Sequence, residues 1–139
     1  MNTNHLSILI ADDDLDDQLF IVDALNRIQF DGVVDCVTDG SKLMNLLRES
    51  GEFTLPSTIL LDLNMPFKNG FEVLSEMHVD PMLNQIPVLV LSSTTSQDDQ
   101  QRCLRLGAAR VFQKPVSITD YDTVALQVVD FVRTAAMPR

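Results

Sequence analysis

Short apolar segments alternate along this chain with longer segments whose apolar residues recur at helical spacing. Five of the short segments are expected to form strands, at residues 6–11, 33–38, 57–62, 87–92 and 110–114. Helices are expected between and after them, at residues 15–28, 43–47, 71–77, 96–106 and about 119–136. The pattern therefore predicts five successive units of a strand followed by a helix.

The expected third and fourth strands indicate the kind of sheet. Residues 58–61 read Thr-Ile-Leu-Leu and residues 88–91 read Val-Leu-Val-Leu. Such continuously apolar strands cannot turn one face to water, and they are typical of parallel sheets covered by helices on both faces. We therefore expect a doubly wound α/β fold with a five-stranded parallel sheet. At 139 residues the chain predicts a single domain over 1–139, with its core at about 6–136 and no effector domain.

The charge of the chain restricts its partners. Twenty acidic residues against ten basic ones give a net charge of −10, which repels nucleic acid and anionic membrane surfaces. Proteins and cations are the partners that this charge favours.

No apolar run approaches the roughly 20 residues that span a bilayer, and no basic, apolar leader opens the chain. We expect a cytoplasmic protein, with Cys36 and Cys103 as small buried side chains.

Polar residues follow the expected strands at one edge of the sheet, where parallel α/β folds bind their ligands. Asp12 and Asp13 follow the first strand, and Asp62 closes the third. Ser92 ends the fourth strand and Lys114 the fifth. Three carboxylates so close together need a cation, and oxygen ligands in an incomplete cage suit Mg²⁺. A lysine and a hydroxyl beside them could hold a phosphoryl group, with Asp62 as the nucleophile.

Three motifs carry a resemblance to a known family. Residues 8–14 read Ile-Leu-Ile-Ala-Asp-Asp-Asp, residues 60–66 read Leu-Leu-Asp-Leu-Asn-Met-Pro before Gly70, and residues 111–115 read Val-Phe-Gln-Lys-Pro. In this order they closely resemble response-regulator receiver domains, over about residues 6–132. The resemblance implies the flavodoxin-like strand order 2-1-3-4-5 in a (βα)5 fold. It also implies a stand-alone receiver of a two-component system rather than an enzyme with an external substrate.

The resemblance implies a role for each acidic residue at this edge. Asp62 would accept a phosphoryl group from a sensor histidine kinase. Asp13, Asp62 and the backbone carbonyl of Asn64 would bind Mg²⁺, and Asp12 would assist through water. The phosphorylated chain would then signal by binding another protein or by passing the group to a histidine phosphotransfer protein.

The resemblance also implies roles for the residues that respond to the phosphoryl group. Lys114 would bind it, and Ser92 would be the switch hydroxyl that moves toward it. The peptide between Lys114 and Pro115 would be cis. Asn64 and Thr94 match positions that tune the lifetime of the phosphoryl group in receivers.

One position departs from the family pattern. Many receivers carry Tyr or Phe three residues before the lysine, and this chain has Val111 there. Phe112 should point to the opposite face of its strand, so it is not expected to take over the role of that ring. Residues 77–87 are similar to the longer connection of the cyanobacterial phytochrome response regulators.

Several of the same residues also have plainer interpretations. Asp14 is interpreted as a helix cap, and Asp16 and Asp17 as a solvated acidic face. The fourth helix is largely polar and is expected to be loosely held. In the fifth helix four apolar residues are left over from one buried stripe, Val124, Leu126, Val129 and Phe131, and some of this surplus is expected to be exposed. A homodimer through these two helices would cover it.

Two other function classes compete with a receiver. A phosphatase of the haloacid dehalogenase type also uses an aspartyl nucleophile at a strand end, but it needs a second Asp where this chain has Asn64. A pseudo-receiver would bind partners without ever taking a phosphoryl group. The presence of all five edge residues, Asp12, Asp13, Asp62, Ser92 and Lys114, argues against the pseudo-receiver, and Val111 argues slightly for it.

Overall fold

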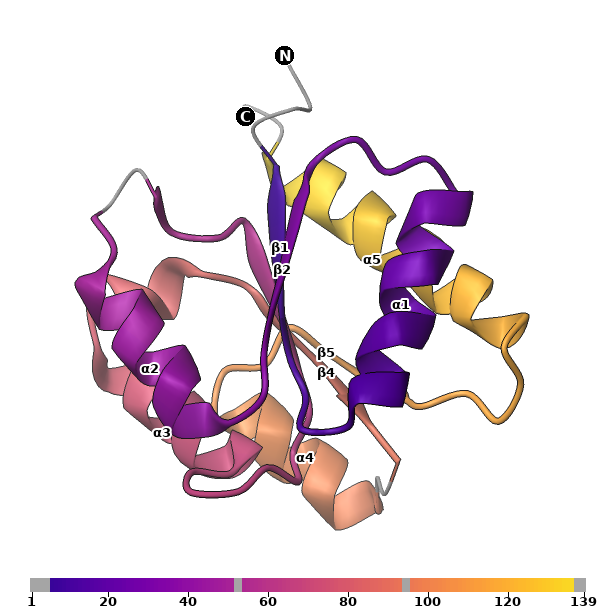
Figure 1. The fold of residues 1–139 in the computed structure, drawn as a ribbon. Coiled ribbons are helices and arrows are strands. Elements are labelled where there is room, and N and C mark those ends of the chain that lie inside the picture. The colour runs from indigo at the N-terminus through magenta and orange to yellow at the C-terminus, as the bar shows by residue number, and fades with distance from the viewer. Residues whose placement is uncertain (1–5, 52–53, 94–95, 137–139) are drawn as a thin grey trace.

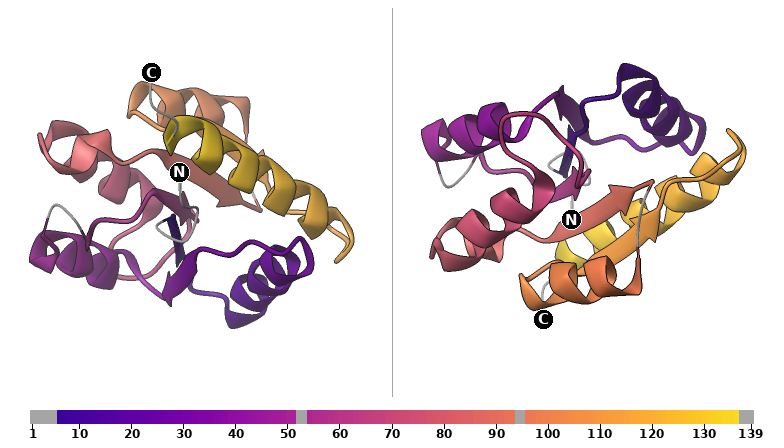
Figure 2. Two further views of the ribbon diagram at one scale, coloured as in Figure 1. Left: turned by 90° about the horizontal axis from the view of Figure 1, so that it is seen from above. Right: turned by 90° about the horizontal axis from the view of Figure 1, so that it is seen from below.

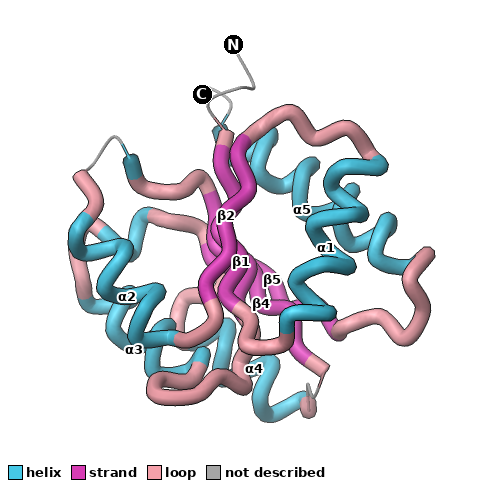
Figure 3. Tube along the Cα trace, in the orientation of Figure 1, coloured by secondary structure: helices cyan, strands magenta, loops and turns pink. Residues whose placement is uncertain are grey.

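The computed structural model describes residues 6–51, 54–93 and 96–136 (Figure 1). Within them, five strands alternate with five α-helices, as the tube in Figure 3 shows. The strands are β1 (Ser7–Ala11), β2 (Val33–Val37), β3 (Thr58–Leu61), β4 (Val88–Ser92) and β5 (Arg110–Gln113). The α-helices are α1 (Leu15–Arg27), α2 (Gly40–Glu49), α3 (Gly70–Val79), α4 (Gln97–Arg105) and α5 (Asp120–Ala136). A 3₁₀ turn, η3 (Leu83–Gln85), separates α3 from β4.

The strands form one parallel sheet in the order β2-β1-β3-β4-β5. This order confirms the predicted doubly wound fold. Helices α1 and α5 cover one face, and α2, α3 and α4 cover the other, as Figure 2 shows from two sides. The strand order reverses between β1 and β3, so the carboxyl ends of these two strands flank the position at which such folds bind ligands.

Each face of the sheet has its own hydrophobic core. Alternate side chains of β1 divide between them, since Ile8 and Ile10 pack toward α1 and α5 while Leu9 and Ala11 pack toward α2 and α3. Strands β3 and β4 are buried along their whole length, as their apolar sequences predict. The two edge strands, β2 and β5, are only partly buried. The core therefore holds β1 and β3 rigidly, and these strands carry the acidic residues.

The interpretation of Asp14 as a helix cap is confirmed. The carboxylate of Asp14 accepts hydrogen bonds from the backbone N–H groups of Asp16 and Asp17, and the hydroxyl of Ser96 accepts one from Asp99. Asn69 caps α3 in a reciprocal capping box with Glu72.

The expectation that some apolar surplus of α5 is exposed is confirmed, but only one of the four residues is clearly exposed. Val124 and Val129 are buried and Phe131 is half-buried, while Leu126 is exposed. The exposed surplus is small because α5 packs against both the sheet and α1, so its buried face is wider than one narrow stripe. The expectation for the cysteines is half right, since Cys103 is buried but Cys36 is exposed on the edge strand β2. Among the described residues, no helix is long and apolar enough to cross a membrane.

Gly70 offers a test of how the loop after β3 is held. A Cβ atom at this position would lie 2.6 Å from the carbonyl oxygen of Asp62 and 2.7 Å from the Cα of Leu63. Backbone atoms cannot move aside as a flexible side chain can, so Gly70→Ala should lower the free energy of unfolding by about 1–3 kcal/mol. Urea denaturation measures this change.

Gly51→Ala is the matched control, because a Cβ there would meet nothing within 4 Å. It should change the free energy of unfolding by less than about 0.5 kcal/mol. Equal stabilities of the two variants would contradict this account of the loop.

Candidate functional site

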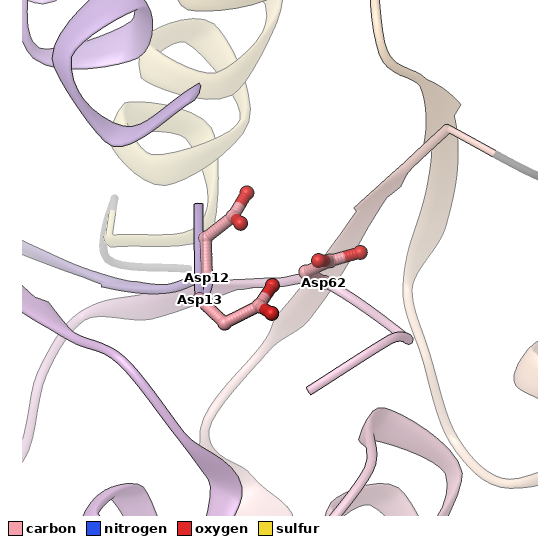
Figure 4. Close-up of side chains that lie close together, drawn as sticks. All are labelled: Asp12, Asp13 and Asp62. Carbon is pink, nitrogen blue, oxygen red and sulfur yellow. The ribbon is translucent and has the colours of Figure 1, made fainter. Parts of the chain in front are cut away.

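Three carboxylates meet at the carboxyl end of the sheet (Figure 4). Asp12 and Asp13 follow β1, and Asp62 follows β3. Backbone hydrogen bonds extend the sheet as far as these residues, since the N–H of Asp12 donates to Val37 O at 3.1 Å and that of Asp62 to Ala11 O at 2.9 Å. One oxygen from each of the three carboxylates lies within 4.8 Å of the others. The structure thus brings together the three acids that the sequence predicted.

Burial makes this cluster costly without a counter-charge. The side chains of Asp12 and Asp62 belong to residues only 5% and 4% exposed. Burial raises the pKa of Asp12 from 3.8 to about 6, against the lowering effect of its hydrogen bond with Lys114. Burial also raises the pKa of Asp62. Asp13, the third member of the cluster, is exposed. Two buried carboxylates and one open one, all hard oxygen donors, fit a divalent cation such as Mg²⁺.

Lys114 reaches this cluster from the end of β5. Its Nζ atom lies 2.8 Å from Asp12 Oδ2 and 3.5 Å from Asp62 Oδ2. Burial alone would lower the pKa of this ammonium group, but its carboxylate partners outweigh burial and raise the pKa. The group therefore stays charged beside Asp62, where it could neutralise a phosphoryl oxygen.

Asp17 also belongs to this site, contrary to its interpretation as part of a solvated face. Its Oδ2 atom lies 2.8 Å from Lys114 Nζ, as close as that of Asp12. The residue lies in the first turn of α1, shortly after β1, and this closeness to Asp12 along the chain was the only signal of its role in the sequence. Asp16, its neighbour, is exposed as expected.

Gln18 is a second residue that the sequence did not single out. Its side-chain amide is buried and donates to Asp12 O at 2.7 Å and to Val37 O at 3.0 Å. These bonds tie the first turn of α1 to the ends of β1 and β2. The backbone N–H of Asp14 donates to Asp12 Oδ1 at 3.0 Å, which fixes that carboxylate as well.

The loop after Asp62 is held close to the cluster. The N–H of Asn64 lies 3.4 Å from Asp62 Oδ1, and the N–H of Gly70 donates to Leu63 O at 2.9 Å. Asn64 itself is exposed. It lies next to the carboxylates, as a residue would need to if its backbone is to bind the cation or if it is to control the access of water to Asp62.

Ser92 is fully buried at the end of β4, and its Oγ atom has no hydrogen-bond partner among the described residues. A buried hydroxyl without a partner is unfavourable, and it marks a position where a further acceptor could bind. The N–H of Lys114 donates to Ser92 O at 2.9 Å, so the hydroxyl and the lysine are held on adjacent strands. Thr94 lies outside the described residues.

Val111 and Phe112 point to opposite faces of β5, as the alternation of the strand predicts. Val111 packs on the α2–α4 side and Phe112 on the α1–α5 side. The aromatic ring is therefore on the wrong face to replace the one missing at Val111.

The cis peptide expected before Pro115 is not present, because the described residues contain no cis peptide bond. The trans form is also the intrinsically favoured one for a bond preceding proline. Lys114 makes its contacts with Asp12 and Asp17 from the trans backbone.

Comparison with protein families matches residues 8–125 to the response regulator receiver domain. Among curated proteins, the chain is 37% identical over 95 residues to the response regulator Rcp1 of a Synechocystis strain, covering 66% of this chain and 65% of that protein. It is 32% identical over 126 residues to a probable methanogenesis regulatory protein, FilR2, of Methanothrix harundinacea, covering 89% and 81%.

Two solved structures share the whole fold. One is that of the phosphorylated cyanobacterial phytochrome response regulator RcpA, with a TM-score of 0.86, 33% identity and coverage of 96% of this chain and 97% of that one. The other is the Mn²⁺-bound form of Rcp1, with a TM-score of 0.84, 30% identity and coverage of 96% and 99%. These similarities include a cyanobacterial phytochrome response regulator, the group that residues 77–87 resemble.

The raised pKa of Asp12 predicts how Mg²⁺ binding depends on pH. A protonated carboxyl holds no cation, so the affinity for Mg²⁺ should fall as the pH drops through about 6. In the metal-free chain, the raised pKa of Asp12 adds to the free energy of unfolding when this carboxyl is protonated. That contribution is fully present below pH 3.8 and is lost as the pH rises through about 6. Added Mg²⁺ should therefore raise the Tm more at pH 7.5 than at about pH 5.

Thermal unfolding with MgCl₂, compared with KCl of equal ionic strength, measures this difference. The same Mg²⁺-induced rise in Tm at both pH values would contradict the assignment of the cation to this cluster.

Proposed function

Because the chain belongs to the response regulator receiver family, we propose that it accepts a phosphoryl group on Asp62 in a Mg²⁺-dependent reaction with a histidine kinase. The observation that carries the proposal is the arrangement of Asp12, Asp13, Asp62 and Lys114 around one point at the sheet edge. Three acids alone would make only a cation site. The lysine beside Asp62 adds the second requirement, a positive charge for an anionic group bound to that carboxylate.

The reaction needs one nucleophile and one leaving group. A carboxylate oxygen of Asp62 attacks the phosphorus, and the bond from phosphorus to the donor imidazole nitrogen breaks. The leaving group keeps the bonding electron pair, and the product is an aspartyl phosphate. When held by Asp13, Asp62 and the backbone carbonyl of Asn64, with Asp12 assisting through water, Mg²⁺ would neutralise charge that develops on the phosphoryl oxygens.

Two side chains are available to hold the product. Lys114 is charged and partly buried beside Asp62, and Ser92 Oγ is buried without a partner among the described residues. A phosphoryl oxygen would give that hydroxyl an acceptor. Movement of Ser92 would act on the segment between β4 and α4, and α4 has a single buried residue, Cys103. Weakly packed elements are the ones that shift most easily between two states.

Exposed apolar side chains near this edge support a protein as the phosphoryl donor. Leu15 opens α1 directly after the acidic residues, and Phe67 lies in the loop after β3. Val116 follows Lys114 by two residues, and all three side chains are largely exposed. Apolar surface of this kind is more often found at protein contacts than at sites for small polar ligands. We also propose that the chain acts in the cytoplasm. Once phosphorylated, it would bind a downstream protein or pass the phosphoryl group to a histidine phosphotransfer protein.

A phosphatase remains the weaker alternative. It needs a second carboxylate two residues after the nucleophile, where the exposed Asn64 lies. An amide cannot give up a proton to a leaving group as a carboxylic acid does. A pseudo-receiver is the second alternative, and it differs from a working receiver in that Asp62 takes no phosphoryl group.

Intact mass spectrometry with acetyl phosphate and Mg²⁺ tests the proposal. The wild-type chain should gain one phosphoryl group, and Asp62→Asn should gain none because an amide is not a nucleophile for phosphorus. Asp16→Asn is the matched control, since it removes one acidic charge at an exposed position, and it should be phosphorylated as the wild type is. Omission of Mg²⁺ should reduce the gain strongly. A phosphorylated Asp62→Asn would move the acceptor to another residue, and an unphosphorylated, folded wild type would favour the pseudo-receiver.

We further propose self-association through α4 and α5, although fewer exposed apolar residues support it than the sequence indicated. Leu104 and Leu126 remain exposed on these helices after Val124 and Val129 are assigned to the core. Leu126→Asp should therefore weaken a dimer, whereas Leu19→Asp, at a similarly exposed position on α1, should not. Sedimentation velocity with and without acetyl phosphate measures both. A wild-type chain that stays monomeric at high concentration in both conditions would rule out the dimer.

A further inference from the structure

Lys114 has three carboxylate neighbours, and they differ in what else they can bind. Asp12 and Asp62 belong to the cluster that could hold a cation, and their Oδ2 atoms lie 2.8 Å and 3.5 Å from Lys114 Nζ. Asp17 Oδ2 lies 2.8 Å from the same nitrogen, but Asp17 is not a member of that cluster. A bound cation would therefore share Asp12 and Asp62 with Lys114, whereas Asp17 would pair with Lys114 alone.

The structure holds Asp17 firmly in this position. Its backbone N–H donates to the capping carboxylate of Asp14 at 3.2 Å. The next residue, Gln18, is bound to the ends of β1 and β2 through its side chain. The carboxylate of Asp17 therefore stands on a helical turn that is anchored at the same sheet edge as the site itself.

We propose that Asp17 is a positioning residue, which holds Lys114 beside Asp62 when a divalent cation binds the cluster of Asp12, Asp13 and Asp62. A cation at those carboxylates draws their charge away from the ammonium group. Asp17 then supplies the remaining counter-charge and keeps Lys114 within reach of a phosphoryl group. Without Asp17, the ammonium would depend on Asp12 and Asp62 alone and would compete with the cation for their oxygens.

This inference rests on the proposed function for the role of Lys114, but its first test does not require phosphorylation. Asp17→Asn should weaken Mg²⁺ binding about threefold or more relative to Asp16→Asn, a size typical of a single accessible ion pair. Both variants remove one acidic charge from the first turn of α1 and leave its Asp14 cap in place. Titration of backbone amide signals with MgCl₂ by NMR gives the two dissociation constants.

The same pair of substitutions in a Lys114→Ala background separates two explanations. If Asp17 acts through the lysine, Asp17→Asn should then change Mg²⁺ affinity no more than Asp16→Asn does, because the competing ammonium is gone. If Asp17 merely attracts the cation from a distance, its effect should persist in that background. Persistence would overturn the proposal, and so would equal effects of Asp17→Asn and Asp16→Asn in the presence of Lys114.

A second measurement works on the metal-free chain. The chain has three lysines, Lys42, Lys68 and Lys114, so their ammonium groups can be assigned by NMR from single substitutions. Asp17→Asn should shift the Lys114 ammonium signal and speed its hydrogen exchange, and Asp16→Asn should leave it unchanged. An unchanged Lys114 signal in Asp17→Asn would overturn the proposal, whereas a failure of acetyl phosphate to label the wild type would overturn the proposed function alone.

Discussion

The site depends on the balance between buried negative charge and one ammonium group. Asp12 and Asp62 are nearly excluded from water, and their pKa values rise for that reason. Lys114 offsets part of the charge from the end of β5. The balance is incomplete, because Asp13 and Asp17 add further negative charge nearby. A site with this excess of negative charge favours the binding of a cation. It then favours an anionic group that contacts both the cation and the lysine.

The parallel sheet explains why these residues meet. All five strands end at the same edge, and the order β2-β1-β3-β4-β5 puts the ends of β1 and β3 side by side. Apolar packing on both faces makes the central strands rigid. The carboxylates therefore stand on the most constrained part of the fold, while the exposed loops and the lightly packed α4 around them can respond to a change in charge.

Much of this arrangement could be predicted from the sequence, because it follows from local pattern. Continuous apolar strands such as residues 58–61 indicate a parallel sheet, and polar residues at strand ends then indicate its site. The contact of Asp17 with Lys114 could not be predicted in this way, because the two residues are 97 positions apart. They meet only because of how the first turn of α1 is placed relative to the end of β5. The burial of Val124 and Val129 was missed because it depends on how α1 and α5 pack. The trans bond before Pro115 differs from the form that family resemblance implied.

The most direct test of the account is to locate the phosphoryl group chemically. Borohydride reduces an aspartyl phosphate to homoserine, which marks the acceptor permanently in a peptide mass spectrum. After treatment with acetyl phosphate and Mg²⁺, we predict homoserine at position 62 and at no other aspartate in the chain. Homoserine at another acidic residue, or none in a folded chain beside a labelled control receiver, would contradict the assignment of Asp62 as the phosphoryl acceptor.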